Sequence, residues 1–395
     1  MTLWIVAVAA AAIGFLLLEA GCRWWIRQRS PYYVWPPQTR LELHLDREVF
    51  PDLDPRVRFE TNADGERGGA APGDERGLFR ILAAGGSAVE CYALDQPKTW
   101  PGLLERLLNE PERLDVLGAR RVHVGNIGHS GVGSAELHRI LECVLPRYGR
   151  LDAILIMVAA SDVYHWLEEG APSRPPSAVP EDMLFACHPE HRFGWKPSRW
   201  ALTEIARRLR RAWSRQVQVK ERAGSWFLAA RRMRAEAKEM RSTMPDPTVM
   251  LSNFEHYFTR LVRRAQAHAD RVIIMRQPWF EKDYTAEERA RFWHGGAGRP
   301  WKEKVTSYYS LEVVNQLLSL VEARVVSVAD ALGVPHLDLR PVLDGGLRHY
   351  YDHDHYTPAG AAVVAGTVAA ALTPVPPARS APRKQSARTV ASGTW

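Results

Sequence analysis

The chain has 395 residues, 46% of them hydrophobic, and a formal net charge of +7. This length and apolar content allow one large α/β domain, or two smaller ones, with a sizeable core. Much of the positive charge is concentrated in residues 201–241, so the net charge does not indicate a nucleic-acid-binding protein. Cys22, Cys91, Cys143 and Cys187 show no zinc-type spacing, which predicts buried or free thiols and no metal site.

The chain opens with an apolar segment. Residues 3–18 are uncharged, and residues 1–27 are long enough for a helix to span a bilayer. Trp24 and Trp25 suit the membrane interface, and arginines follow them as a charged stop. A cleaved signal peptide usually begins with Lys or Arg, and this segment does not. We therefore expect residues 1–27 to be a retained single-pass anchor, with the flanking arginines favouring a cytoplasmic position for the rest of the chain.

Residues 28–77 are rich in proline, glycine and charge. Their glycines lack the Gly-Lys-Ser/Thr ending of a phosphate-binding loop. The composition predicts a linker, with a short strand or two near residues 56–60.

Residues 78–373 alternate between strand and helix patterns. Apolar runs predict strands at residues 79–84, 121–128, 151–160, 271–278 and 335–340. Helical periodicity and capping residues predict helices at residues 99–109, 134–149, 254–268 and 311–332 and from residue 357 onward. Such alternation predicts an α/β three-layer sandwich with a central parallel sheet, whose reactive groups lie at the carboxyl ends of the strands.

The alternation is interrupted from about residue 166 to 247. This stretch has helical periodicity and no alternating strand pattern, so it predicts a helical, basic insertion outside the sheet. Its arginines fit a solvated helix face, a surface for anionic lipid, or a cap that meets an acidic polysaccharide. Residues 374–395 have the composition of a disordered tail.

Polar residues follow several of the predicted strands. Ser87 stands after the first strand in "GGSAVE", where a plain tight turn is the alternative interpretation. Gly131 follows the second strand, Ser161 follows the third, and Asp352 and His355 stand three residues apart before the last helix. Hydroxyl, imidazole and carboxylate groups together are the components of acyl transfer.

In this order, "GGSAVE", "NIGHSG" and "DHDHYTPAG" resemble the blocks of the SGNH superfamily, the GDSL-like esterases and lipases. The resemblance covers roughly residues 79–372. It implies Ser87 as nucleophile, His355 as general base, Asp352 as the acid that orients His355, and Gly131 as an oxyanion-hole donor. It also implies hydrolysis of an ester, such as an O-acyl group on a glycan or lipid, without a metal or organic cofactor. Membrane-anchored members of this family often face the periplasm or the exterior. This is the opposite of the cytoplasmic position that the flanking arginines favour.

One block departs from the family pattern. The third block usually reads Gly-x-Asn-Asp, with the Asn side chain donating to the oxyanion, whereas this chain has "AASD" with Ser161 in place of Asn. The shorter hydroxyl leaves three possibilities: a slow enzyme, a rearranged oxyanion hole, or no catalysis. Two further functions therefore stay open, an O-acyltransferase with the same triad and an inactive binding or assembly subunit for envelope polysaccharide. The sequence leaves the oligomeric state open.

The neighbours of these residues have simpler interpretations. We expect Glu90 and Cys91 to be helix-entry and core residues, and Asp162 to be a structural hydrogen-bond acceptor. His129 and His353 are secondary candidates for lining the site.

Overall fold

The computed structural model describes residues 2–29, 32–71, 73, 75–175, 180–186, 200–214, 217–343 and 346–374. Cys187 and the predicted disordered tail from residue 375 onward lie outside the described residues.

The core of the protein is a five-stranded sheet with the strand order β10-β8-β5-β3-β4. Its strands are β3 (Leu78–Gly85), β4 (Arg121–Asn126), β5 (Leu151–Met157), β8 (Ala269–Arg276) and β10 (His336–Asp338). Every pair of neighbours is parallel. The predicted parallel sheet is confirmed, and its central strand β5 is buried along nearly its whole length because helices cover both faces.

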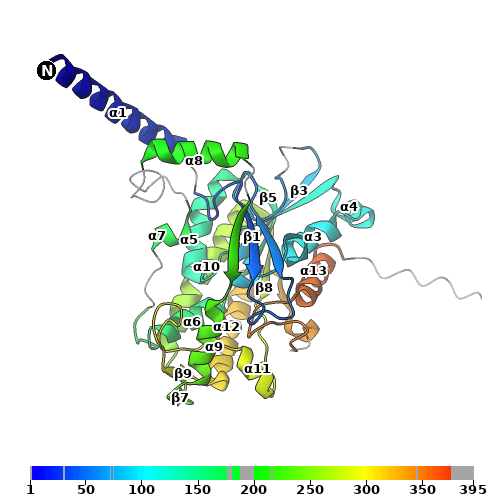
Figure 1. Ribbon diagram of the computed structural model, residues 1–395. Coiled ribbons are helices and arrows are strands. Elements are labelled where there is room, and N and C mark those ends of the chain that lie inside the picture. Colours follow the sequence, from blue (N-terminus) through cyan, green and yellow to red (C-terminus); the bar gives the residue numbers. More distant parts are fainter. Residues whose placement is uncertain are drawn as a thin grey trace, which may run out of the picture.

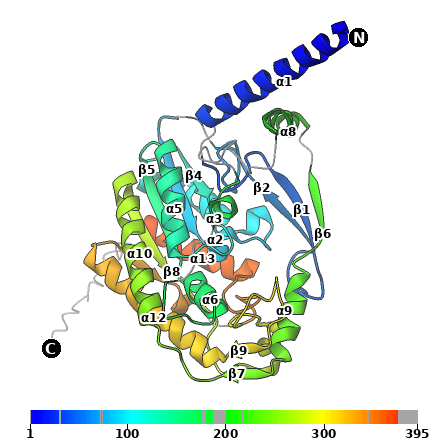
Figure 2. The ribbon, with the colours of Figure 1, turned by 90° about the vertical axis from the view of Figure 1, so that its left-hand side faces the viewer.

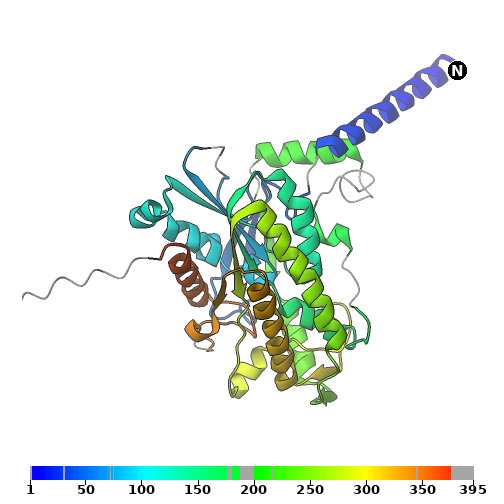
Figure 3. The same cartoon turned by 180° about the vertical axis from the view of Figure 1, so that it is seen from behind.

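Helices form a layer on each side of this sheet (Figure 2). One layer contains α5 (Ser134–Val144), α6 (Ala160–Glu168), α10 (Thr248–His268) and α12 (Leu311–Ala331), and the other contains α3 (Trp100–Leu108) and α13 (Pro358–Leu372). Seen from behind, α13 lies on the opposite side of the sheet from α10 and α12 (Figure 3). The three-layer α/β sandwich is therefore confirmed.

Local sequence signals place the ends of these helices. Thr99 accepts a hydrogen bond from the Gly102 N–H at 3.2 Å and begins α3. Thr357 accepts one from the Gly360 N–H at 3.2 Å and begins α13. In both helices a proline follows in the first turn, where its missing N–H costs nothing.

The remaining helices lie outside the two layers. They are α1 (Thr2–Arg29), α2 (Ser87–Glu90), α4 (Pro111–Leu117), α7 (Glu181–Leu184), α8 (Ala201–Ser214), α9 (Trp226–Ala235) and α11 (Ala286–Arg291). Helix α1 projects from the domain, and α8 crosses its C-terminal end (Figure 1). Residues Thr2–Ile26 are long and apolar enough to cross a membrane, a property that an N-terminal signal sequence shares.

A second sheet corrects two predictions. It has the order β2-β1-β6 and consists of β1 (Arg40–Leu45), β2 (Arg56–Glu60) and β6 (Gln218–Ala223). The expected short strand at 56–60 is β2, but β1 also belongs to the segment predicted as a linker, and β6 lies in the insertion predicted to lack strands. Only Ala223 of β6 is buried, so the sequence carries no alternating pattern that would reveal the strand. Strand β7 (Glu239–Arg241) pairs with β9 (Ser307–Tyr309), and no described strand of the insertion joins the central sheet.

The segment predicted as a linker also contributes a buried polar cluster. The Glu66 carboxylate is buried and accepts hydrogen bonds from Asn62 Nδ2 at 2.8 Å and the Tyr148 hydroxyl at 2.7 Å, and it pairs with His123 Nε2 at 3.1 Å. Burial alone would raise the pKa of Glu66, but the hydrogen bond and charge of His123 lower it to about 2. A Cβ atom on Gly125 would lie 2.4 Å from the Glu66 carboxylate, so glycine leaves the room for this cluster. Residues buried through polar contacts form no periodic hydrophobic pattern in the sequence. The composition of residues 28–77 therefore predicts a linker although part of the segment is buried.

Candidate active site

The turn after β3 presents Ser87. A Cβ atom on Gly85 would lie 2.1 Å from the Met157 carbonyl oxygen of the neighbouring strand, so only glycine fits there. The Gly86 N–H donates to the same carbonyl, at 3.4 Å, and Ser87 follows as the first residue of α2. The two glycines therefore let the strand end against β5 and turn sharply, which places the serine hydroxyl at the carboxyl edge of the sheet.

A buried guanidinium holds the end of this short helix. Arg67 donates to the carbonyl oxygens of Cys91 and Leu94, both at 2.7 Å, and to that of Glu90. Its guanidinium also stacks 4.4 Å from the centre of the Phe59 ring. The Glu90 carbonyl is one that a four-residue helix leaves without an intrahelical partner, and the other two belong to the residues that follow the helix. Nothing in the sequence around Arg67 indicates this role.

The structure brings Ser87, His355 and Asp352 together, although Ser87 and His355 are far apart in the chain. Ser87 Oγ lies 2.8 Å from His355 Nε2. His355 Nδ1 lies 2.9 Å from each of the two carboxylate oxygens of Asp352. This is the geometric order of nucleophile, base and orienting acid. Ser87 is partly exposed, whereas Asp352 is fully buried, so a substrate can reach the hydroxyl but not the acid.

Asp352 is fixed by further hydrogen bonds. It accepts from the Asp354 N–H at 3.2 Å, from the His355 N–H at 3.0 Å and from Trp293 Nε1 at 3.2 Å. The Asp354 carboxylate also approaches His355 Nδ1, at 3.3 Å. The N–H groups of Asp354 and His355 donate to Asp352 instead. Asp352 is therefore the better-held partner of the imidazole.

The charges of this group shift its pKa values in a consistent way. Burial alone would raise the pKa of Asp352, but the charge of His355 and its hydrogen bond hold it well below its usual range. Burial would lower the pKa of His355, and the charges of Asp352 and Asp354 overcome this and raise it to about 9. Burial and the neighbouring Asp352 charge raise the pKa of Asp354 to about 7. One carboxylate thus stays ionised beside the imidazole, while the second titrates near neutrality.

Gly131 and Ser161, the two oxyanion-hole candidates, lie in the segments that follow β4 and β5. Gly131 has φ of +74°, a conformation that favours glycine. Among the described residues, the N–H groups of Ser87 and Gly131 donate to no acceptor. Ser161 lies in the first turn of α6, and its Oγ is 3.5 Å from the position that a Cβ on Gly86 would take. Donors without an acceptor are the kind of group that can receive developing negative charge, so the oxyanion hole stays a prediction for these residues.

Two carboxylates hold the loop that contains Gly131. Glu90 accepts from the Ser130 N–H at 2.6 Å and from its hydroxyl. Asp162 accepts from the Ser134 N–H at 2.9 Å and its hydroxyl at 2.6 Å, and burial raises the pKa of Asp162 to about 7. Asp162 is thus a structural acceptor, as expected. Glu90 and Cys91 are buried as expected, but Glu90 is the last residue of α2 and not a helix-entry residue. Its contact with the loop has no signal in the sequence.

No protein-family model matches the chain, and no curated protein does. Several solved structures are similar. A member of the lipolytic protein G-D-S-L family from Veillonella parvula aligns with 74% of this chain and 96% of its own, at 10% identity and a TM-score of 0.37. The α/β hydrolase LAE5 from the metagenome of Lake Arreo aligns with 75% of this chain and 95% of its own, at 14% identity and a TM-score of 0.39. The acetylxylan esterase Axe2 from Geobacillus stearothermophilus aligns with 74% of this chain and 94% of its own, at 14% identity and a TM-score of 0.38.

These similar structures include GDSL-type lipolytic proteins and an esterase, the group that the sequence blocks resemble. Because the identities are low and the TM-scores fall below 0.5, the chemistry of the site rests on its own geometry.

His294 lies beside the triad and has no signal in the sequence that would predict this position. Its ring stacks on Tyr164 at 4.2 Å and lies 6.1 Å from the His355 ring, and its Nε2 is 3.6 Å from Asp354 Oδ1. Burial holds the pKa of His294 well below its usual range, so the ring is neutral. His294, Asp354 and His355 could share a metal ion by distance, but both nitrogens of His355 already contact Asp352 or Ser87. The arrangement fits a packing role for His294.

The two secondary candidates serve the surrounding loops. His353 is buried, and its nitrogens contact the Tyr164 hydroxyl and Asn315 Oδ1, both at 2.9 Å. The His129 ring lies 4.8 Å from the Trp35 ring in a tilted contact, and His129 Nδ1 contacts the Ser130 carbonyl oxygen at 2.9 Å. Both histidines thus have local partners away from Ser87 Oγ.

Proposed function

We propose that this protein is a serine esterase of SGNH type that works through an acyl-enzyme. The observation that carries the proposal is the 2.8 Å contact between Ser87 Oγ and His355 Nε2, with Asp352 on the other nitrogen of the ring. A serine hydroxyl is a weak nucleophile until a base takes its proton, and this contact supplies that base.

The reaction then proceeds in two halves. Ser87 Oγ attacks the ester carbonyl carbon while His355 Nε2 takes the hydroxyl proton, and the carbonyl oxygen becomes an oxyanion. The N–H groups of Ser87 and Gly131, with Ser161 beside them, receive this charge. The intermediate collapses, the C–O bond to the alcohol breaks, and His355 returns the proton to the leaving alkoxide. Water then attacks the acyl carbon while giving a proton to His355 Nε2. The bond between Ser87 Oγ and the acyl carbon breaks, the acid leaves, and His355 returns the proton to Ser87 Oγ.

Asp352 acts through the imidazole. Its carboxylate holds the Nδ1–H tautomer of His355, so that Nε2 faces the serine, and it stabilises the imidazolium that forms in each half-reaction. The buried position and fixed hydrogen bonds of Asp352 suit this role, because the carboxylate does not need to reorganise during the reaction.

The substrate we propose is an O-acyl ester of a glycan or lipid, and the catalytic part would work at a membrane. Purified full-length protein in detergent should hydrolyse p-nitrophenyl esters of graded chain length. Ser87→Ala should abolish the rate, and Ser252→Ala, on the exposed face of α10, should leave it unchanged. Equal rates in wild type and Ser87→Ala would refute the proposal.

Two other functions are distinguished by the same assay. An alcohol added as acceptor should leave the free acid as the main product of an esterase, whereas an acyltransferase would form the new ester. A chain that turns over none of the esters would instead fit a binding or assembly subunit.

A further inference from the structure

The arginine-rich helix α8 is attached to the end of α1 through a buried carboxylate. Glu19 of α1 accepts hydrogen bonds from the N–H groups of Ala201 at 2.7 Å and Leu202 at 3.1 Å. Arg23 Nε, one turn further along α1, donates to the same carboxylate at 2.6 Å. Glu19 therefore caps the first turn of a helix that follows it by about 180 residues in the chain.

A small apolar cluster surrounds this cap. Ile26 of α1 and Ala201 of α8 are fully buried against each other, with Cys22 and Ile205 packed beside them. The Trp200 ring lies 5.5 Å from the ring of Phe15. Removal of α1 as a cleaved signal would expose this cluster and leave the first N–H groups of α8 without their acceptor. The packing therefore favours an α1 that stays in the mature protein.

The position of Glu19 sets the depth of α8. Residues 3–18 are uncharged and rise by about 24 Å along the helix axis, close to the roughly 30 Å of hydrocarbon in a bilayer. Glu19 then stands at the edge of the hydrocarbon, and Trp24 follows in the headgroup region. Because the first turn of α8 is hydrogen-bonded to Glu19, that turn lies at the same depth.

The composition of α8 suits that depth. Its sequence carries four arginines against one glutamate, and its Leu209 side chain is 55% exposed. Trp200, just before the helix, is 49% exposed in spite of its contact with Phe15. Apolar and aromatic groups that remain exposed next to a membrane-spanning helix, together with excess positive charge, are the features of a helix that lies in an anionic membrane surface.

We propose that α1 is retained as a membrane anchor and that α8 lies in the headgroup layer of an anionic bilayer, held there by the Glu19 cap. This goes beyond the proposed esterase activity and does not depend on it. Glu19 is a positioning residue that fixes the angle between the anchor and the domain, and so keeps the domain at a set distance from the lipid.

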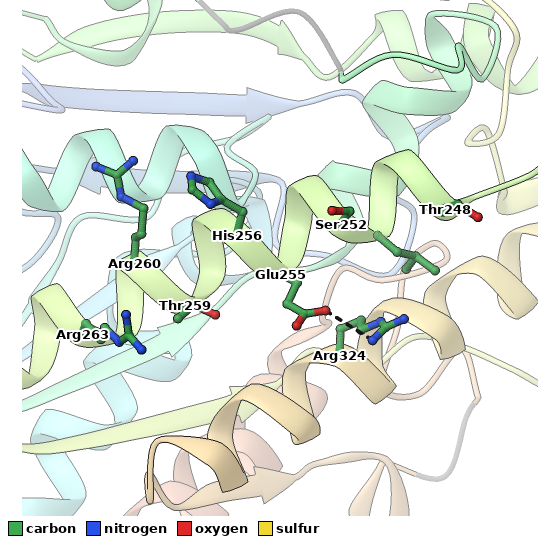
Figure 4. Close-up of a pocket in the computed structure, with 9 residues that line it drawn as sticks. Thr248, Ser252, Glu255, His256, Thr259, Arg260, Arg263 and Arg324 are labelled. Carbon is green, nitrogen blue, oxygen red and sulfur yellow. Dashed lines mark ion pairs between the residues drawn. The ribbon is translucent and has the colours of Figure 1, made fainter.

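A second basic surface provides a matched control. On the exposed face of α10, Arg260 and Arg263 stand along a groove that also contains Arg324, which pairs with Glu255 at 3.2 Å (Figure 4). This helix packs on the central sheet rather than on α1. Its arginines match those of α8 in chemistry but lack the attachment to the anchor.

The test uses the full chain in nanodiscs that hold one copy, made of phosphatidylcholine alone or of phosphatidylcholine with phosphatidylglycerol. Amide hydrogen exchange is followed by mass spectrometry for the peptides of α8. We expect exchange about tenfold slower in the anionic discs. Arg207→Glu/Arg210→Glu should abolish the difference, whereas Arg260→Glu/Arg263→Glu should preserve it. Glu19→Ala should speed exchange in the first turn of α8 in both lipids, and Glu19→Gln, which keeps one acceptor oxygen, should have a smaller effect.

Equal exchange of α8 in the two lipids would overturn the proposal. So would protection that appears only in discs holding two copies, since the surface would then bind a second chain instead of lipid. The intact mass of protein extracted from membranes supplies an independent check. Retention of residues 1–27 is the expected result, and a mass that lacks them would refute the anchor whatever the outcome of the esterase assays.

Discussion

Replacing Asp354 with Asn should move the acidic limb of the pH–rate profile to lower pH. The Asp354 carboxylate lies 3.3 Å from His355 Nδ1 and is buried with it. The charges of Asp352, Asp354 and, more weakly, Glu90 oppose burial and raise the pKa of His355 to about 9. Asn removes one of these charges while keeping a side chain of the same shape.

The size of the shift follows from the charge state of Asp354. An opposite charge at this range moves a pKa by about one to three pH units. Asp354 is ionised where His355 titrates, because its own pKa is about 7 against about 9 for His355. It lies farther from Nδ1 than Asp352 does, at 3.3 Å against 2.9 Å, so we expect the lower end of that range. His355 must be neutral to act as a base, so kcat/KM rises as the pH rises through its pKa. The variant should therefore reach its plateau about one pH unit earlier and be up to about tenfold faster near neutral pH.

The assay is kcat/KM for p-nitrophenyl acetate as a function of pH. Asp352→Asn is the matched control, and it should lower the plateau by about 10⁴ because the imidazole loses its tautomer. An acidic limb that stays in place in Asp354→Asn would show that its charge does not reach His355. A plateau loss as large as that of Asp352→Asn would make Asp354 the orienting acid.

Three other predictions concern neighbouring residues. Ser161→Ala should lower kcat only a few-fold, and Ser161→Asn should raise it or leave it unchanged; a loss of two to three decades in Ser161→Ala would instead show a full oxyanion donor. Trp293→Phe removes the hydrogen bond to Asp352 and should lower kcat about tenfold or more with KM unchanged. Glu66→Gln should cost about 3 kcal/mol of the free energy of unfolding, measured against the exposed control Glu112→Gln. Because the pKa of Glu66 is lowered to about 2, its contribution should be present above its usual pKa and be lost as the pH falls toward 2.

The buried strands and the blocks at their ends could be predicted from the sequence. Strand β5 is buried on both faces, so its residues form a continuous apolar run that predicts a strand. Thr99 and Thr357 predict helix starts because their hydroxyls cap the first turn. Ser87 and His355 stood out because polar groups follow the ends of strands or precede a capped helix.

Other parts of the fold and the site have no pattern in the sequence that predicts them. Strand β6 is exposed along most of its length, so it shows no alternation. Arg67 and Glu66 are held by carbonyl and side-chain hydrogen bonds, which need the folded chain to exist. Trp293 and His294 come from a tryptophan-rich loop, and only the tertiary fold brings them beside Asp352 and Asp354.

Covalent labelling of Ser87 tests the central claim most directly. The full-length protein is treated with a fluorophosphonate probe, and the modified residue is located by peptide mass spectrometry. The triad predicts a single adduct on Ser87, with labelling that is strongly slowed in His355→Ala and unaffected in Ser252→Ala. A Ser87 that stays unmodified in folded protein, or that reacts equally fast without His355, would contradict an activated nucleophile at this position.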